Sequence, residues 1–254
     1  MQRNTSNPSV VVVTPTCGSP KVLDAFHSVQ TQTYSSKHLL VVDGTKFVGN
    51  FVDTLNSDPT IYKRDNYDVL YLPQNTGNLN GEKYWGHRIF AGIANFVNED
   101  IIVFLDDDNW FEPTHLEEHV KNIVENKRNL SFSLRNICAD DGTFLFQDNC
   151  ESIGSHAVFN SQPGSNHFHV DTSAYAFRRE YLLAVGHLWH GGYAQDRKFW
   201  AAVSDDDYTR WGGTGKYTLN YRLGSTKDSA ARAFFEIGNK VMEARHGGKY
   251  PWAK

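Results

Sequence analysis

The chain has 254 residues, a formal net charge of −4 and 40% hydrophobic residues, which is ordinary for one globular domain with a substantial core. The acidic balance argues against general nucleic-acid binding, which needs a basic face. Three cysteines without a C-x-x-C pair disfavour a disulfide framework or a zinc knuckle. No apolar run is long enough for a transmembrane segment or a signal peptide, so we expect a cytoplasmic protein, at most peripheral to a membrane.

Four short apolar runs recur roughly thirty residues apart in the first half of the chain, and each is continuous rather than alternating. This pattern is typical of strands buried on both faces of a parallel sheet. Amphipathic stretches between the runs, such as the one that follows Ser19-Pro20, predict connecting helices. We therefore expect an α/β fold with a mostly parallel, doubly wound sheet, whose ligands bind beyond the carboxyl ends of the strands. The four runs are residues 10–13, 39–42, 69–72 and 101–105.

The second half of the chain has a different pattern. Residues 131–137 and 168–177 alternate like half-exposed strands, and we expect them in a smaller mixed sheet. Helical periodicity returns at residues 195–203 and 228–244. We expect a single domain over residues 1–254 with three parts. These are a nucleotide-binding half at about residues 10–110, an acceptor-binding and catalytic half at about residues 111–225, and a C-terminal helix and tail at residues 226–254.

Three consecutive carboxylates, Asp106, Asp107 and Asp108, directly follow the fourth apolar run. Crowded carboxylates repel one another and resist desolvation, so packing does not explain them. Asp106 and Asp108 are two apart at a strand end and can face one cation together. Carboxylate oxygens suit Mg²⁺ or Mn²⁺, which also bind substrate phosphates. The acidic run predicts a divalent-metal site, and a solvated turn or a helix cap is the alternative.

Five motifs occur along the chain in the following order: Val10-Val11-Val12-Val13-Thr14-Pro15-Thr16, Leu40-Val41-Val42-Asp43-Gly44, Asn75-Thr76-Gly77, Phe104-Leu105-Asp106-Asp107-Asp108 and Gln195-Asp196-Arg197-Lys198-Phe199-Trp200. With these motifs the chain resembles the family-two glycosyltransferases with the A-type fold. The resemblance runs from about residue 10 to residue 225. It implies metal-dependent, usually inverting transfer of a hexosyl or pentosyl group from a nucleotide-diphosphate sugar to a glycan or other hydroxyl acceptor.

The resemblance also implies which residues bind the donor. The segment from Thr14 to Thr16 would lie along the base and ribose, and Asp43 would contact one of them, although this chain has Asp43-Gly44 where many members have two acids. Each residue also has a structural alternative: a proline turn for residues 14–16, an Asp-Gly turn for Asp43, and a solvated helix face for Arg88. The expected nucleotide-sugar-binding residues are Thr14, Pro15, Thr16, Asp43, Asn75, Gly77, Arg88, Asp107 and Arg222, with Arg88 and Arg222 directed at the diphosphate.

Asp196 matches the family's acidic pair before an aromatic residue, with Gln195 in place of the first acid. An inverting transferase needs a carboxylate that takes the proton of the acceptor hydroxyl, and we assign this general-base role to Asp196. The alternative is an acid that only complements a helix dipole. Residues 205–207, also acidic, are a rival for the base, although their setting resembles a solvated helix end.

Several aromatic and histidine side chains are further candidates for sugar stacking or metal binding. Trp110 and Trp189 would stack on sugar rings or belong to the core. A histidine could complete the metal site, and the candidates are His167, His169, His187, His190 and His246.

Two other functions use similar features. A nucleotidyltransferase would need a Gly-rich, Lys/Arg-bearing loop after the first strand, whereas residues 14–20 contain one glycine and no arginine. A non-catalytic carbohydrate-binding relative would have no need of the acidic run.

Overall fold

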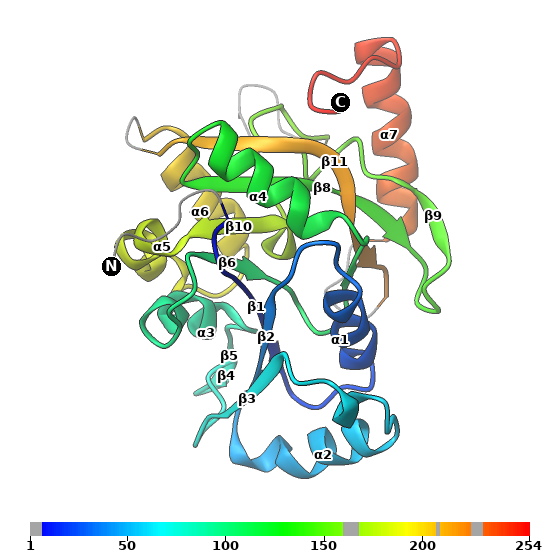
Figure 1. Cartoon of the computed structure of the whole chain (residues 1–254). Helices are drawn as coiled ribbons and strands as arrows, with labels where there is room; N and C mark the ends of the chain where they lie inside the picture. The colour runs from blue at the N-terminus through cyan, green and yellow to red at the C-terminus, as the bar shows by residue number, and fades with distance from the viewer. Residues whose placement is uncertain (1–6, 160–167, 207–208, 225–230) are drawn as a thin grey trace.

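The computed structural model describes residues 7–159, 168–206, 209–224 and 231–254. Within them, nine strands form one mixed sheet in the order β3-β2-β1-β6-β10-β8-β11-β7, with β9 paired to β8 (Figure 1). A separate hairpin is formed by β4 (Asn78–Leu79) and β5 (Glu82–Lys83). The nine strands are β1 (Val10–Thr16), β2 (Lys37–Val42), β3 (Tyr67–Tyr71), β6 (Ile101–Phe104), β7 (Trp110–Phe111), β8 (Leu130–Cys138), β9 (Phe144–Gln147), β10 (Tyr175–Arg178) and β11 (Trp211–Arg222).

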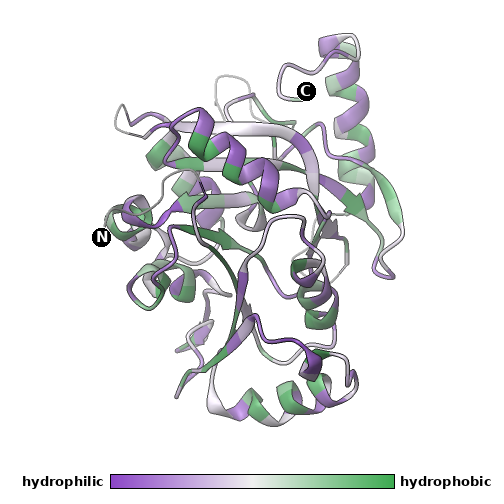
Figure 2. Ribbon diagram, viewed as in Figure 1, coloured by the Kyte–Doolittle hydropathy of each residue, from purple (hydrophilic) through white to green (hydrophobic). Residues whose placement is uncertain are grey.

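The parallel half of the sheet confirms the first part of the prediction. β1 pairs in parallel with β2 and β6, and β2 pairs in parallel with β3. The four valines of residues 10–13 are buried, and Figure 2 shows the central strands as hydrophobic ribbon. The run at residues 69–72 differs from the prediction, since β3 lies at the edge of the sheet and is only half-buried. Because β1, β2, β3 and β6 are parallel, their carboxyl ends meet at one edge of the sheet and leave the residues beyond them accessible.

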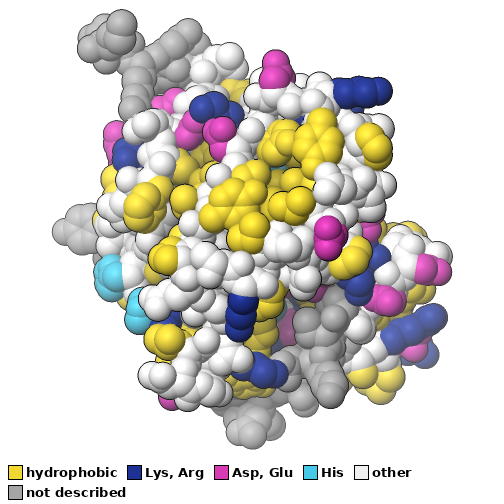
Figure 3. Space-filling view, turned by 90° about the horizontal axis from the view of Figure 1, so that it is seen from below, with side chains coloured by type: hydrophobic (Ala, Val, Ile, Leu, Met, Phe, Trp, Pro, Cys, Tyr) yellow, Lys and Arg dark blue, Asp and Glu magenta, His cyan; other side chains and the backbone are white. Residues whose placement is uncertain are grey.

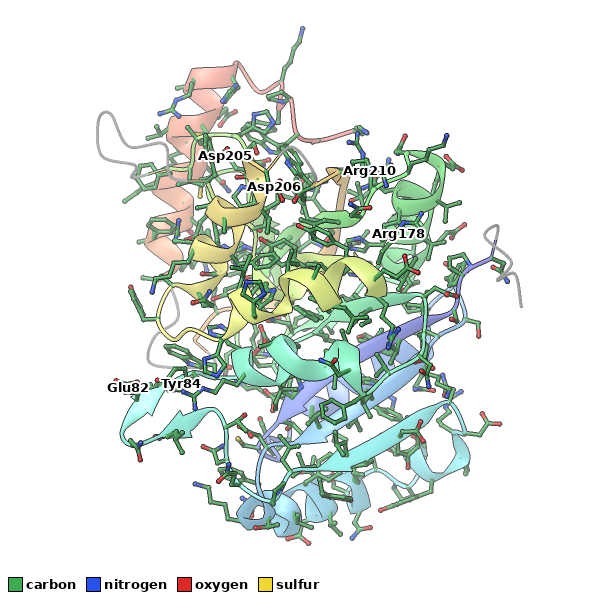
Figure 4. All side chains as sticks on the ribbon, turned by 90° about the vertical axis from the view of Figure 1, so that its left-hand side faces the viewer. Glu82, Tyr84, Arg178, Asp205, Asp206 and Arg210 are labelled. Atoms are coloured by element: carbon green, nitrogen blue, oxygen red, sulfur yellow. The ribbon has the colours of Figure 1, made fainter. Side chains whose placement is uncertain are left out.

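Helices cover both faces of the sheet. Leu40 and Val42 of β2 pack in one core cluster with α1 and α2, whereas Val41 packs in the cluster that contains α3. Figure 1 shows α1 and α4 on the near face, and Figure 4 shows α3, α5 and α6 on the opposite one. The helices are α1 (Val22–Gln30), α2 (Val48–Asn56), α3 (His87–Gly92), α4 (His115–Glu125), α5 (Arg179–Val185), α6 (Gln195–Ser204) and α7 (Arg232–His246).

The second half differs in detail from the sequence prediction. Its strands extend the main sheet instead of forming a smaller one, because β10 pairs antiparallel with β6 and with β8. β8, predicted to be half-exposed, is buried at every position. The reason is that α4 packs on it and that Leu134 and Ile137 join a core cluster with residues of α7. Of residues 168–177, only the last three lie in a strand, because Asp171 accepts a hydrogen bond from Ser173 N and starts a 3₁₀ turn.

Two surface features complete the description. No helix in the described parts of the chain is long and apolar enough to cross a membrane. Figure 3 views the molecule from below, the side on which α2 and β3 lie in Figure 1, and shows hydrophobic side chains gathered on that face. Val52, Tyr62 and Tyr71 are exposed members of this region of the chain.

Candidate active site

The acidic run forms a turn directly after β6, and three other segments hold it. Asp106 accepts a hydrogen bond from Ser173 Oγ at 2.9 Å, and its backbone N–H donates to the same oxygen at 3.0 Å. Asp107 accepts from Thr16 Oγ1 at 2.6 Å, at the end of β1. The backbone carbonyl of Asp108 accepts from Arg222 Nε at 3.0 Å. The three carboxylates are thus placed by long-range contacts as well as by the end of the strand.

The electrostatics of this turn fit a divalent cation. Burial raises the pKa of Asp106 well above its ordinary value, and the charges of Asp108 and Asp171 raise it further. Burial also raises the pKa of Asp107 to about 7, against the hydrogen bond from Thr16. A hard cation would compensate the crowded negative charge through oxygen ligands. In the described ranges no group of three or more His, Cys, Asp or Glu side chains could hold a metal, so phosphates or water would have to complete its shell.

Asp43, at the end of β2, organises the loop that follows β3. Its carboxylate accepts hydrogen bonds from Thr76 N at 2.7 Å, Thr76 Oγ1 at 2.9 Å, Gly77 N at 2.8 Å and Asn75 Nδ2 at 2.9 Å. A side chain at Gly77 would place its Cβ 2.3 Å from the backbone oxygen of Trp85, which only glycine avoids. The structure therefore brings Asp43, Asn75 and Gly77 together, and we name residues 75–77 the donor loop. Contact of Asp43 with a base or ribose stays a prediction.

Of the predicted nucleotide-binding segment at the end of β1, residues 14–16, only part is accessible to a ligand. Thr14 is completely buried, and its Oγ1 lies 2.9 Å from His38 Nε2. Its side chain therefore points into the protein, and contact of this segment with a nucleotide stays a prediction. Pro15 is half-buried and packs on Gly86. Thr16 is buried and holds Asp107, so Pro15 is the more accessible part of this segment.

Arg222 braces the acidic turn from behind. Its Nε donates to the carbonyl of Asp108, Nη1 donates to the carbonyl of Asp140, and Nη2 pairs with the carboxylate of Asp24. The guanidinium also lies over the ring of Trp110, 4.7 Å from its centroid. These contacts show a structural role for Arg222 and give Trp110 a protein partner for its face. The predicted contact of Arg222 with a diphosphate stays a prediction.

Asp196 lies in the first turn of α6, as the sequence predicts. Its Oδ2 lies 2.7 Å from His169 Nε2, and its Oδ1 accepts from the backbone N–H of Arg197 at 2.8 Å. Burial alone would raise the pKa of Asp196, but His169 and Arg197 lower the pKa below its ordinary value. The side chain keeps 25% of its surface exposed. Asp196 is therefore an ionised, partly accessible carboxylate, as a proton acceptor must be at neutral pH, although its lowered pKa makes it a weak base.

The rival acids lie elsewhere. Asp205 and Asp206 follow the last turn of α6 and are exposed, and Figure 4 shows them far from the β4–β5 hairpin. Asp207 lies outside the described residues. With the whole of α6 between them and Asp196, they are poor candidates for the base.

A buried arginine on β8 lies between the two carboxylate sites. Arg135 is 2% exposed. Its Nε donates to Asp148 at 2.7 Å, its Nη1 to Asp171 at 2.6 Å, and its Nη2 to Glu151. We call Arg135 and its three carboxylates the Arg135 cluster. A buried cation among three acids is stable only while every member is paired.

The Arg135 cluster connects the acidic turn with Asp196. On one side, Asp171 Oδ1 accepts from Ser173 N at 3.0 Å, and Ser173 Oγ donates to Asp106. On the other side, the second oxygen of Glu151 accepts from Arg197 Nη2 at 2.6 Å, next to Asp196 in the chain. A continuous series of hydrogen bonds thus spans the site.

Sequence reasoning missed most of this framework. Ser173 carries no signal that distinguishes it from other serines. Arg135 carries none either, because it alternates with Ser131 and Ser133 on the face that the pattern predicts to be exposed, and only its burial in the structure requires paired carboxylates. His169, expected as a possible metal ligand, is instead hydrogen-bonded to Asp196. Trp189 is fully buried and stacks on Phe199, so it belongs to the core.

The other histidines do not gather at the acidic turn. His187 and His190 are exposed on the segment before α6, and His246 packs against Trp252 with ring centroids 5.0 Å apart. His167 lies outside the described residues. Arg88 lies on α3, with its guanidinium 3.5 Å from the centroid of the Tyr84 ring.

Acidic and loop residues thus gather beyond the carboxyl ends of the parallel strands, where α/β proteins with an open sheet bind their ligands. Residues 9–186 match the family described as glycosyl transferase family 2, and the chain belongs to that family. This confirms the family that the motifs indicated. An uncharacterized protein of Haemophilus influenzae is 31% identical over a region that covers 39% of this chain and 75% of the relative.

Solved structures agree on the fold. A crystal structure of S. aureus TarS 1-349 in complex with UDP superposes with a TM-score of 0.58 at 14% identity, covering 93% of this chain and 64% of that one. The complex of the same fragment with UDP-GlcNAc gives a TM-score of 0.57 at 12% identity, with coverage of 93% and 66%. The chain thus spans slightly less than two thirds of that fragment. The likeness confirms the A-type fold.

Proposed function

We propose that the chain transfers a sugar from a nucleotide-diphosphate sugar to a hydroxyl group of a glycan or a similar acceptor. The observation that carries this proposal is the pairing of two carboxylate sites, the acidic turn and the ionised Asp196, within one hydrogen-bonded framework. Family membership supports the reaction class. The TarS fragment that binds UDP and UDP-GlcNAc has the same fold, which supports a nucleotide-diphosphate donor.

Asp106 and Asp108 would hold the divalent metal, Mn²⁺ or Mg²⁺. When bound, such an ion neutralises the charge that develops on the departing diphosphate. Asp107 is turned toward β1 by Thr16 and would face the donor sugar side of the turn. Ser173 keeps the carboxylate of Asp106 in place, since its hydroxyl bonds both the side chain and the backbone of that residue.

The donor would lie along the edge formed by Pro15, Thr16 and the donor loop. Asp43 would act mainly by holding Asn75 and Gly77 in position, since four protein donors already occupy its carboxylate. A loop fixed in this way loses little conformational freedom when the nucleotide binds.

Asp196 would act as the general base of an inverting transfer. The bond between the anomeric carbon and the diphosphate oxygen breaks, and the bond to the acceptor oxygen forms from the opposite side. The acceptor's proton passes to a carboxylate oxygen of Asp196, and the nucleoside diphosphate leaves with the bond's electron pair. His169 and Arg197 N hold the carboxylate in one orientation during this step.

Two measurements test the proposal. A nucleotide-diphosphate sugar that binds should raise the melting temperature of the protein, and more so with Mn²⁺ present. The same donor should then be hydrolysed or transferred in a metal-dependent reaction. Asp108→Asn should lower this activity about 10²- to 10³-fold, whereas Asp205→Asn, which changes an exposed acid, should leave it unchanged.

Two results would contradict the proposal. One is the absence of a thermal shift with every nucleotide and nucleotide sugar. The other is release of pyrophosphate from a nucleoside triphosphate together with a sugar phosphate, which would identify a nucleotidyltransferase.

A further inference from the structure

A cavity of about 690 Å³ lies between the β4–β5 hairpin, the start of α3 and the segment that precedes α6. Its volume is in the range of small-molecule sites. Figure 4 shows Glu82 and Tyr84, two of its lining residues, at the hairpin below α5 and α6. The cavity is lined by Glu82, Lys83, Tyr84, Trp85, Arg88 and residues 190–193.

Three of the nine residues that line the cavity, Tyr84, Trp85 and Tyr193, carry large aromatic rings. Tyr193 is 80% exposed, so most of its ring surface is accessible to a ligand. Trp85 has φ +48°, a left-handed backbone conformation that a bulky residue rarely adopts. The donor loop imposes this conformation, since the N–H groups of Tyr84 and Trp85 both donate to Gly77 O, at 2.7 and 3.2 Å. Rigid, accessible aromatic faces suit the apolar face of a sugar ring.

The cavity also contains a cation that lacks a carboxylate partner among the described residues. The guanidinium of Arg88 lies over the Tyr84 ring, and the Tyr84 hydroxyl is hydrogen-bonded to Glu82. Nε of Arg88 is buried and has no hydrogen-bond acceptor in the described parts of the chain. A guanidinium in this position is best satisfied by the oxygens of a phosphate or a carboxylate.

The position of the cavity assigns its ligand to the acceptor side. The backbone of Trp85 rests on the donor loop at Gly77, while the side of the cavity formed by residues 190–193 leads directly into α6 and Asp196. His87 ties the two sides together, because its Nδ1 lies 3.1 Å from Gly191 O. An acceptor must reach the donor sugar and the base at the same time, and this cavity lies between the segments that carry them.

We infer that this cavity is the acceptor subsite and that the acceptor is a saccharide that carries a phosphate or a carboxylate. The sugar ring would pack on Tyr193 and Trp85, and the anionic group would pair with Arg88. The inference rests on the proposed function, and it moves Arg88 from the donor diphosphate to the acceptor. It also assigns a substrate class that family membership does not specify.

The test compares three probes of similar size: glucose 6-phosphate, glucuronate and neutral glucose. Their dissociation constants are measured by ligand-observed NMR with the full chain and its variants. The two charged probes should bind about tenfold more tightly than glucose. Arg88→Met should abolish that preference and leave glucose unchanged, and Arg88→Lys should retain part of it. Tyr193→Ala should weaken all three probes to a similar extent, a few-fold.

Two exposed residues outside the cavity provide matched controls. Arg64→Met removes one surface cation, and Tyr62→Ala removes one exposed ring, so neither should change the binding of any probe. The ranking of glucose 6-phosphate against glucuronate decides between phosphate and carboxylate as the anionic group.

The inference is overturned if the charged probes bind no better than glucose, or if none of the three binds. It is also overturned if Arg88→Met raises the KM for the nucleotide sugar and leaves probe binding intact, since Arg88 would then serve the donor. Failure of the proposed function gives a different result. In that case no nucleotide changes the melting temperature, while the charged probes still bind and still depend on Arg88.

Discussion

The two sides of the site are built in different ways. On the proposed donor side, Asp43 and the acidic turn directly follow β2 and β6, which both pair in parallel with β1. On the proposed acceptor side, Asp196 is held by His169 and by the backbone of Arg197, and the side chain of Arg197 pairs with Glu151 of the Arg135 cluster. The proposed donor side therefore depends mainly on strand order, with Ser173, Thr16 and Arg222 holding the acidic turn, whereas the proposed acceptor side depends on buried charged pairs.

This difference has consequences for mutation. Parallel strand ends converge whatever the side chains beyond them do, so one change on the donor side should have a local effect. Buried ion pairs fail together, because removal of one partner leaves the others desolvated and uncompensated. We therefore expect the acceptor side to be the more sensitive to changes away from the reacting atoms.

The largest expected effect on activity is that of Asp196→Asn. The amide cannot take the acceptor's proton, so transfer should fall about 10²- to 10⁴-fold. Binding of the nucleotide sugar, measured by thermal shift, should remain, because none of the hydrogen bonds that hold the acidic turn involves Asp196. Asp205→Asn, at the other end of α6, is the control. Near-normal transfer by Asp196→Asn would show that another group is the base.

Arg135→Met tests whether the acceptor side relies on the Arg135 cluster. Three carboxylates lose their common cation, and the free energy of unfolding should fall by about 3–5 kcal/mol. Urea denaturation measures this change. Arg232→Met, which breaks the exposed pair with Glu236, should cost no more than about 1 kcal/mol. A loss as small as that of the control would mean that the cluster contributes little to stability.

Gly77→Ala tests whether donor binding depends on the conformation of the donor loop. The new Cβ would lie 2.3 Å from Trp85 O, so the donor loop must shift, at a cost of about 1–3 kcal/mol. The KM for the nucleotide sugar should rise, while the environment of Asp196 should be unchanged. Gly92→Ala is the control, since an added Cβ there meets nothing within 4 Å. An unaltered KM in Gly77→Ala would separate the loop from donor binding.

The smallest expected effect concerns pH and metal. Because the pKa values of Asp106 and Asp107 are raised in the folded protein, the folded state retains protons that the unfolded chain releases. Their contribution to stability is therefore greatest at low pH. It is lost as pH rises through the pKa of the folded state, about 7 for Asp107.

Melting temperatures between pH 5 and 8 measure this effect in metal-free protein. The melting temperature of Asp107→Asn should fall less over this range than that of the unchanged chain. Each kcal/mol of difference in the free energy of unfolding corresponds to about 2–4 °C. Mn²⁺ should stabilise the unchanged chain more at pH 8 than at pH 5, because ionised carboxylates bind the cation. A metal effect that is independent of pH would argue against a metal on these acids.

The sequence by itself was sufficient for the features that depend on local pattern. Continuous apolar runs predict the buried strands β1, β2 and β6. The acidic run and Asp43 directly follow two of these runs, and this position marks them as candidate site residues. The motif at Asp196 likewise predicts an acid in the first turn of α6, which the structure confirms. These features are local because a strand or helix imposes its periodicity on the residues within it.

Only the tertiary structure decided which side chains meet across the site. The link between Asp106 and Ser173, the pairing of Asp196 with His169 and the Arg135 cluster join segments that the chain pattern does not relate. The same holds for Thr14. Its position near the end of β1 suggests a ligand contact, but in the structure its hydroxyl is hydrogen-bonded to His38. Such pairings depend on how β8, β10 and the segments before α6 pack, and that packing is a property of the whole core.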